Sequence, residues 1–376
     1  MKAIFRQFGL PLGVVAFAAL TTAGPVSAAD SKTVGFVVRD WFTAVYNTKF
    51  MDECPEGLTA SNDEIYMQSL TKEQRGKFTG NGYIQLQDRQ GVALRRGPNK
   101  EEVCVDPTGV KDPPMKIIEG KYSFGANLDG TEDGRATAKS CKHDKFISAV
   151  DGKTKVDNQM YRLIGCTYGF RKGGLPDTNA NELRGTSGLG MILIELTGVD
   201  DRRNDDDVTV SFYRSIDQYA FDGNGKPLPY TSYRVEMGMD GKPAYGDTLK
   251  GKLKDGVLTT ERGTVRLPFY GNYAFMSPTI KDFGLVMQMA ADGRTMTGQI
   301  TGYFDSRDYV RYANGLIGHS TIGDSCPAYH EMGPKLADGY PDPVTGECTA
   351  FSSAFDITGY AAFVVRPKAE TRTSER

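Results

Sequence analysis

Carboxylate and amide side chains are concentrated in one short loop between two segments that have the composition of strands. Residues 200–207 hold five aspartates and one asparagine, with two arginines among them. Carboxylates at this density repel one another unless a cation lies between them. Calcium is a suitable cation because it takes about six to eight oxygen ligands in a flexible geometry. The candidate calcium ligands in this loop are Asp200, Asp201, Asn204, Asp205 and Asp207.

Two other loops resemble the first in composition. Residues 127–134 alternate oxygen-bearing side chains with glycines, and residues 151–158 follow soon after. None of the three matches the EF-hand pattern, because its ligand spacing and closing glutamate are missing. The alternative is solvated turns, which Asp, Asn and Gly favour for backbone reasons, and Arg202 and Arg203 neutralise part of the first loop. The candidate calcium ligands in these two loops are Asn127, Asp129, Asp133, Asp151 and Asp157.

The sequence contains no complete motif for zinc binding, haem attachment or a catalytic nucleophile. His143 and His330 lie close to cysteines, but a zinc site needs about three or four convergent ligands and the chain has no CxxC pair. Haem attachment would need C-x-x-C-H, which is absent. Ser69-Leu-Thr-Lys72 has the S-x-x-K spacing without its companion motifs, and Ile322 replaces the second glycine of a nucleophile elbow around Ser320.

Glu195 is the candidate catalytic carboxylate. It interrupts the apolar run from Met191 to Leu196, on the strand face that Met191 and Leu193 share. A glutamate in apolar surroundings has a raised pKa, which suits a general acid. A hydrolase of the glycosidic type needs a second carboxylate about 5 to 10 Å away. The alternative is a strand whose outer face is partly solvated.

The elements that must position these residues are strands in the second half of the chain. Asp255-Gly256 and Asp292-Gly293 are hairpin turn signals between such segments. Short strands with turns at this spacing predict an antiparallel β-sandwich-like domain, a jelly-roll or similar, over residues 186–366. The predicted strands are Met191–Val199, Val208–Arg214, Leu285–Ala290, Thr295–Phe304 and Phe351–Val365.

The preceding part, residues 29–185, is irregular and is expected to pack on the β domain. Val34–Tyr46 is predicted as a strand that contains the only tryptophan, Trp41. Ser61 and Glu64 form a capping box, which predicts a short helix over Asn62–Leu70, and a second helical turn is expected at Thr71–Phe78. Residues 367–376 are a polar tail.

Six cysteines indicate disulfides and an oxidising compartment. An even count in an exported chain is first interpreted as a disulfide framework, although six cysteines allow about fifteen pairings. The expected bonds join nearest neighbours in the chain, since each would close a loop rich in Gly, Pro and charge. These pairs are Cys54–Cys104, Cys141–Cys166 and Cys326–Cys348.

Residues 1–28 have the three parts of a cleavable signal peptide. Lys2 and Arg6 precede an apolar stretch, and small residues lead to Val26-Ser27-Ala28, a cleavage site of the A-x-A type. The stretch is shorter than the roughly 20 residues that span a bilayer, and nothing later resembles a transmembrane anchor. We therefore expect export to the periplasm or the medium.

Composition excludes one class of partner and leaves several functions open. A net charge of −2 argues against nucleic-acid binding, which normally shows as a basic patch. The leading hypothesis is an exported binding or accessory protein for carbohydrate or another envelope polymer, stabilised by calcium. A sugar could stack on tyrosines near the acidic loop, namely Tyr213, Tyr219, Tyr230 and Tyr233. The alternatives are a secreted hydrolase acting through carboxylates and a purely structural envelope protein.

Overall fold

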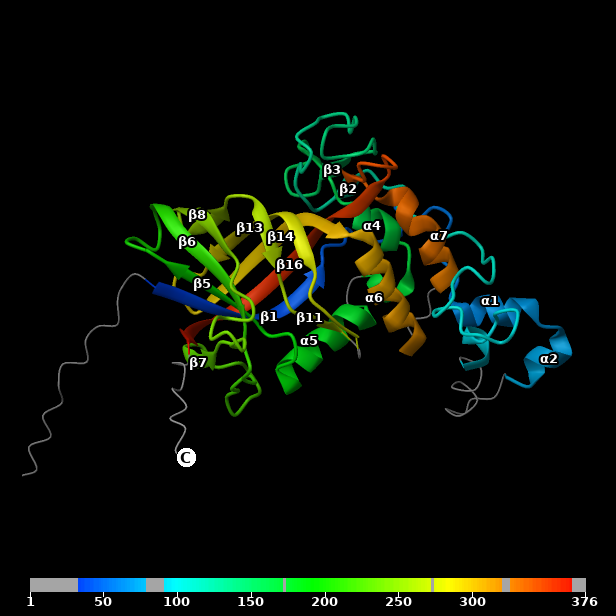
Figure 1. The fold of residues 1–376 in the computed structure, drawn as a ribbon, viewed down its shortest axis with the longest axis horizontal. Coiled ribbons are helices and arrows are strands. Elements are labelled where there is room, and N and C mark those ends of the chain that lie inside the picture. The colour runs from blue at the N-terminus through cyan, green and yellow to red at the C-terminus, as the bar shows by residue number, and fades with distance from the viewer. Residues whose placement is uncertain (1–32, 79–90, 172–173, 272–273, 320–324, 367–376) are drawn as a thin grey trace, which may run out of the picture. The chain divides into compact units, whose positions relative to one another are not determined.

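The computed structural model describes residues 33–78, 91–171, 174–271, 274–319 and 325–366. The predicted signal peptide at 1–28 and the polar tail at 367–376 lie outside the described residues. The described residues belong to one compact unit, which Figure 1 shows as a ribbon.

Eight antiparallel strands form a closed barrel. Each strand pairs with the next barrel strand in the sequence, and β1 pairs with both β5 and the last strand, β16. At this closing seam, a Cβ on Gly35 or Gly359 would lie 2.5 Å from a carbonyl oxygen of the opposite strand, so both positions require glycine. The barrel strands are β1 (Thr33–Thr43), β5 (Ile192–Thr197), β6 (Asp205–Arg214), β8 (Thr248–Lys254), β9 (Val257–Thr260), β13 (Thr279–Met289), β14 (Thr295–Asp305) and β16 (Cys348–Val365).

The predicted β-sandwich is therefore wrong, although the mainly β composition is confirmed. Sandwich and barrel strands share the same alternation of side chains, so periodicity does not distinguish the two architectures. The deciding contact is β1 with β16, which joins the two ends of the described chain. It also places β1 in the barrel, although the sequence groups it with the irregular N-terminal part.

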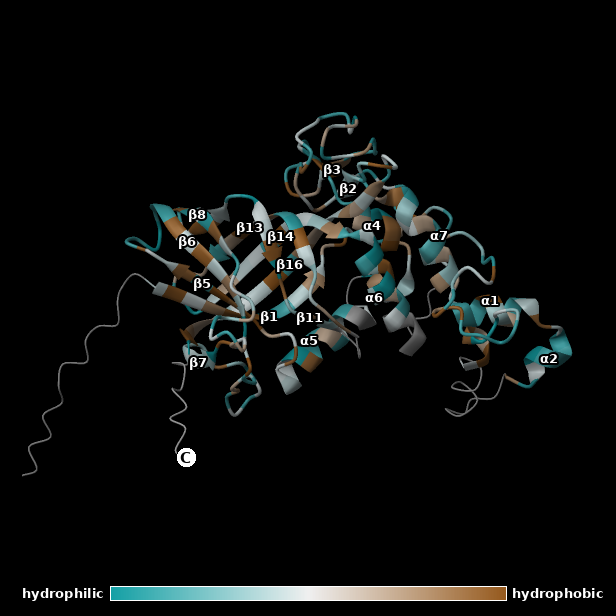
Figure 2. Cartoon of the chain, in the orientation of Figure 1, coloured by the Kyte–Doolittle hydropathy of each residue, from teal (hydrophilic) through white to brown (hydrophobic). Residues whose placement is uncertain are grey.

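The barrel interior is an apolar core. In the first part of β14, Met296 and Ile300 are buried while Thr295 and Thr297 are exposed, as in a strand with one face on the core. Figure 2 shows the same alternation of hydrophobic and hydrophilic residues along the visible strands. An eight-stranded barrel is just wide enough for side chains to fill it. Those that do so include Phe36, Ile194, Leu196, Val210, Phe212, Leu258, Leu285, Met287 and Ile357.

Local turn signals were predicted correctly. Asp255 and Gly256 have φ angles of 51° and 82°, the positive values that a type I′ turn requires, and they join β8 to β9. The turn at Asp292-Gly293 joins β13 to β14. The capping box of Ser61 and Glu64 starts α1. The helices are α1 (Asn62–Ser69), α2 (Lys72–Gly76), α4 (Gln159–Ile164), the 3-10 turn η1 (Tyr168–Phe170), α5 (Leu175–Ser187), α6 (Ser306–His319) and α7 (Cys326–Leu336).

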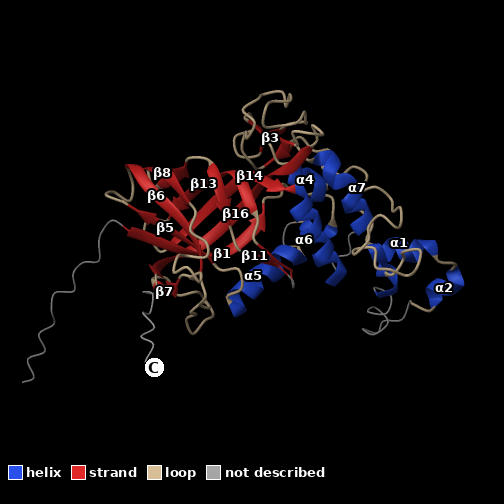
Figure 3. Cartoon of the chain, viewed as in Figure 1, coloured by secondary structure: helices blue, strands red, loops and turns tan. Residues whose placement is uncertain are grey.

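The helices lie outside the barrel, where Figure 3 shows them on one side of the strands. Helix α5 packs on β1, and α6 packs on α7 and β16. Smaller strands complete the described fold: β2 (Tyr122–Ser123), β3 (Phe146–Ser148), β4 (Lys155–Val156), β7 (Thr231–Arg234), β10 (Gly263–Arg266), β11 (Phe269–Gly271), β12 (Ala274–Met276) and β15 (Gly339–Pro341). No helix among the described residues is long and apolar enough to cross a membrane.

All six cysteines form disulfides, as predicted, but the nearest-neighbour pairing is wrong. The bonds are Cys54–Cys166, Cys104–Cys326 and Cys141–Cys348. Two of them connect segments that precede the barrel's second strand to segments near its last strand. These bonds therefore tie the N-terminal part to α7 and β16 instead of closing local loops.

Candidate functional site

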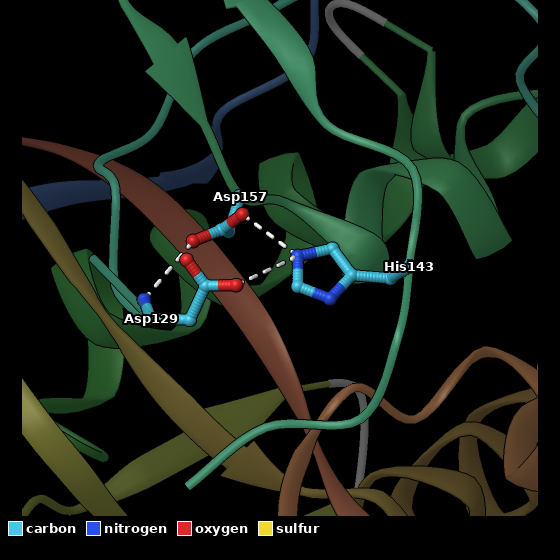
Figure 4. A group of neighbouring side chains, drawn as sticks. All are labelled: Asp129, His143 and Asp157. Carbon is cyan, nitrogen blue, oxygen red and sulfur yellow. Dashed lines mark hydrogen bonds and ion pairs between the residues drawn. The ribbon is translucent and has the colours of Figure 1, made fainter. Parts of the chain in front are cut away.

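Three acidic and two basic side chains meet in a buried cluster between residues 121–158 and the β15–β16 hairpin. They are contributed by the segment after β2, the segment before β3, the residue after β4 and the residue before β15. No side chain in the cluster is more than 5% exposed. Its members are Asp129, His143, Lys145, Asp157 and Asp338, and Figure 4 draws three of them.

His143 is the centre of this cluster. Its Nδ1–H donates to the carbonyl of Cys141 at 2.8 Å, and its Nε2 lies 2.8 Å from Asp157 Oδ1. Asp129 Oδ2 and Asp338 Oδ2 each lie 3.7 Å from the same nitrogen. Burial alone would lower the pKa of His143, but the Asp157 hydrogen bond and the nearby carboxylates raise it to about 9. His143 is therefore a cation at neutral pH.

Lys145 supplies the second cation. Its Nζ lies 2.5 Å from Asp129 Oδ1, 2.7 Å from Asp157 Oδ1 and 2.9 Å from Asn127 Oδ1. The ligand atoms of Asp129, His143 and Asp157 lie within 4.8 Å of one another, a spacing that a metal ion could bridge. The ammonium group, however, already lies between the two carboxylates, so a metal ion would have to displace it. The arrangement thus favours an internal ion-pair cluster.

Asp338 completes the charge balance. Its Oδ1 accepts a hydrogen bond from the Ser352 amide at 2.6 Å, while its buried Oδ2 has no hydrogen-bond donor. Burial raises the pKa of Asp338 to about 7, against the opposing effect of His143. With Asp338 protonated, two carboxylates face two cations and the cluster is neutral.

Replacing His143 by glutamine should remove a pH-dependent part of the stability. The pKa of His143 in the folded protein, about 9, exceeds the ordinary value of 6.5. The charged imidazole therefore contributes its full stabilisation of the folded state below pH 6.5, and this contribution is lost as pH rises through 9. The difference in unfolding free energy between wild type and His143→Gln should be up to about 3 kcal/mol at pH 6 and should shrink towards pH 9.5. Urea titrations across this range measure it. A difference that does not change with pH would contradict the protonated state.

The other candidate calcium ligands hold turns. Asp205 accepts hydrogen bonds from the amides of Asp200 and Asp207 at 2.7 and 3.0 Å, and Asp207 pairs with Lys250 at 2.6 Å. Three others accept backbone N–H groups within their own turn or from the neighbouring hairpin. They are Asp201, Asn204 and Asp133.

Asp151 behaves in the same way, with both carboxylate oxygens bonded inside its turn. Its Oδ2 accepts from the Thr154 hydroxyl at 2.5 Å, and its Oδ1 accepts from the amides of Thr154 and Lys153 at 2.9 and 3.0 Å. These bonds, the hydroxyl first, lower the pKa of Asp151 to about 2. Of the predicted ligands, the structure brings Asn127, Asp129 and Asp157 together around Lys145.

A thermal melt after removal of metal by chelator tests the calcium hypothesis. A calcium ion that binds only the native state at about a hundred times its dissociation constant adds about 2.7 kcal/mol. Because Lys145, Lys250 and the turn amides already contact most of these carboxylates, we expect the melting midpoint to be the same with and without calcium. A calcium-dependent rise would instead establish a site at one of the three loops.

Glu195 lies on the outer face of the barrel. As predicted from periodicity, it shares that face with Met191 and Leu193, and it is 2% exposed. Its carboxylate pairs with Arg366, and the Tyr213 hydroxyl lies 3.5 Å from Oε2. The guanidinium of Arg366 also covers the Tyr213 ring at 5.1 Å. Glu195 is therefore a buried carboxylate paired with an arginine whose side chain is 44% exposed.

A second pair of carboxyl groups lines a cavity of about 420 Å³ between β1, β16, η1 and α5. Cavities of this size are typical of small-molecule sites. Phe42 and Asp356 are direct partners across β1 and β16, and Asp177 belongs to the first turn of α5. The described residues that line the cavity are Phe42, Thr43, Val45, Phe124, Arg171, Asp177 and Asp356.

Both carboxyl groups in this cavity have raised pKa values. Asp177 is half-buried, and burial raises its pKa to about 6 although Oδ2 accepts a 2.8 Å hydrogen bond from the Thr43 amide. Burial also raises the pKa of Asp356, whose Oδ1 accepts from Gln299 at 3.0 Å. Arg171, at the same cavity, pairs with Glu53 and donates to the Gly165 carbonyl at 2.9 Å. A cavity with two such carboxyl groups can carry out proton transfer.

Sequence analysis did not find Asp177 or Asp356. Asp177 follows Pro176 at a helix start, a position that acidic residues occupy for reasons of helix capping and dipole. Asp356 is a lone acid in the apolar strand Phe351–Val365, the same signal that drew attention to Glu195. No family model, curated protein or solved structure matches this chain.

Proposed function

We propose that this protein is an exported hydrolase whose active site is the cavity lined by Asp177 and Asp356. The observation that carries the proposal is that two carboxyl groups with raised pKa values line one mostly apolar cavity. Perturbed titration in a pocket is a recognised marker of functional sites. The acid–base hydrolase is thus favoured over the tyrosine-lined binding module, which predicts no such pair.

Asp177 is the proposed general acid and Asp356 the proposed general base. A pKa of about 6 leaves Asp177 protonated in mildly acidic solution, so it can give its proton to the leaving oxygen. The Gln299 hydrogen bond favours the ionised form of Asp356, which can take a proton from the attacking water. Hydrolysis then splits one bond, and exchange with solvent restores both groups.

The proposed substrate class is carbohydrate. Phe42 and Phe124 offer apolar ring surfaces to the C–H faces of a sugar, and the carboxyl groups offer acceptors for its hydroxyls. Three disulfides are compatible with export, because compartments outside the cytoplasm allow such bonds to form and persist.

The test is hydrolysis of a panel of 4-nitrophenyl glycosides and soluble envelope polysaccharides by the oxidised protein between pH 4 and 8. Turnover that Asp356→Asn abolishes would support the proposal. Binding of a sugar in this cavity without turnover would favour the accessory-protein hypothesis. Neither binding nor turnover across the panel would count against both.

A further inference from the structure

A second cavity, of about 570 Å³, lies between α6, α7 and residues 102–107. Helix α6 contributes a stripe of residues at helical spacing, and α7 contributes His330 and Pro334. The disulfide Cys104–Cys326 fixes the 102–107 segment to the start of α7. The α6 stripe consists of Arg307, Val310, Arg311 and Asn314.

Among the described lining residues, two arginines outnumber the single carboxylate. The Arg307 and Arg311 side chains are 76% and 82% exposed. Near the start of α6, Arg307 lies 3.4 Å from Asp305 and Arg311 lies 3.4 Å from Asp308. Ion pairs this exposed contribute little, so the two guanidinium groups remain available to another anion. The carboxylate in the lining, Glu102, already faces Arg95 at 3.7 Å.

Several other lining residues are apolar, and one polar lining atom has no hydrogen-bond partner. Val105 is 81% exposed, which is unfavourable for an aliphatic side chain beside a cavity, and Pro107 and Val310 lie with it. Asn314 Oδ1 is buried without a donor. A buried unpaired amide oxygen costs stability, and a polar ligand atom would satisfy it.

We propose that this cavity binds a small amphiphilic anion, an organic carboxylate, sulfonate or phosphate with an apolar body. Arg307 and Arg311 hold the charged head by charge-assisted hydrogen bonds. Val105, Pro107 and Val310 cover the apolar body, and Asn314 accepts from a hydroxyl or N–H of the ligand. This site is separate from the proposed hydrolase cavity, with which it shares no lining residue.

The test uses 1-anilinonaphthalene-8-sulfonate as an anionic fluorescent probe and N-phenyl-1-naphthylamine as its neutral counterpart. The anionic probe should bind one site in the folded protein. Dodecanoate should displace the probe, and inorganic phosphate at the same concentration should not. Arg307→Gln/Arg311→Gln should lower the affinity for the anionic probe by roughly tenfold, because two partly exposed charge contacts are lost. Binding of the neutral probe should change by less than about twofold.

Two further variants make the test decisive. Arg135→Gln/Lys153→Gln removes two exposed charges elsewhere and should leave binding of both probes unchanged. Val105→Asp changes an exposed position, so folding is not at risk, and it should lower the affinity for both probes. Three outcomes would overturn the proposal. In the first, the wild type binds no anionic probe; in the second, the double arginine variant loses affinity equally for both probes; in the third, inorganic phosphate by itself displaces the anionic probe.

Discussion

Asp177→Asn is expected to lower kcat/KM of the proposed hydrolase by about 10² to 10⁴, the usual contribution of a positioned general acid. Asparagine keeps the acceptor for the Thr43 amide, so the N-terminal turn of α5 stays attached to β1. The variant should therefore fold with a melting temperature close to that of wild type. Steady-state rates on the best substrate of the glycoside panel measure the loss.

The pH profile separates a catalytic Asp177 from a structural one. If Asp177 donates the proton, kcat/KM of the wild type falls as pH rises above about 6, since the acid is then ionised. This alkaline limb should disappear in Asp177→Asn. Glu195→Gln serves as the matched control, because Glu195 does not line the cavity, and it should keep the wild-type profile. An Asp177→Asn variant with unchanged rate and profile would remove Asp177 from the mechanism.

Local elements of this fold could be predicted because their signals are local. The capping box at Ser61 and Glu64 and the turns at 255–256 and 292–293 involve residues a few positions apart, and all are found in the structure. Barrel closure depends instead on pairing between β1 and β16, which are separated by the rest of the described chain. Nothing in strand periodicity specifies that partner. The disulfides have the same property, since Cys104–Cys326 and Cys141–Cys348 join distant segments.

For the candidate sites, too, local composition could be interpreted from the sequence, but contacts between distant segments could not. The composition of the loop at 127–134 and of residues 151–158 predicted calcium ligands, and two of these residues, Asp129 and Asp157, lie together around Lys145. The sequence could not show that the cation between them is Lys145, because its position depends on how β3 pairs with β2 and β4. Asp177 and Asp356 are brought to one cavity only when α5 docks on β1. Each residue alone has an ordinary structural explanation.

Lys145→Met is expected to lower the unfolding free energy by about 3–5 kcal/mol, the cost of leaving buried charges without their partner. The ammonium accounts for the contacts of 2.5 and 2.7 Å to Asp129 and Asp157, whose side chains are fully buried. Methionine fills the space but supplies no charge, so both carboxylates lose their closest cation in low-dielectric surroundings. Urea unfolding at pH 7 measures the change, with the exposed Lys153→Met as a control that should stay within about 0.5 kcal/mol.

The double variant Lys145→Met/Asp129→Asn shows whether charge or shape causes that loss. Asparagine keeps the acceptor for the Thr131 amide at 2.8 Å and removes one of the unpaired charges. If the cluster is held by charge balance, the double variant should be more stable than Lys145→Met, with a coupling energy of about 1–3 kcal/mol in the mutant cycle. Additive losses would mean that the carboxylates do not depend on Lys145. In that case the ligand atoms of Asp129, His143 and Asp157 would again be open to interpretation as a metal site.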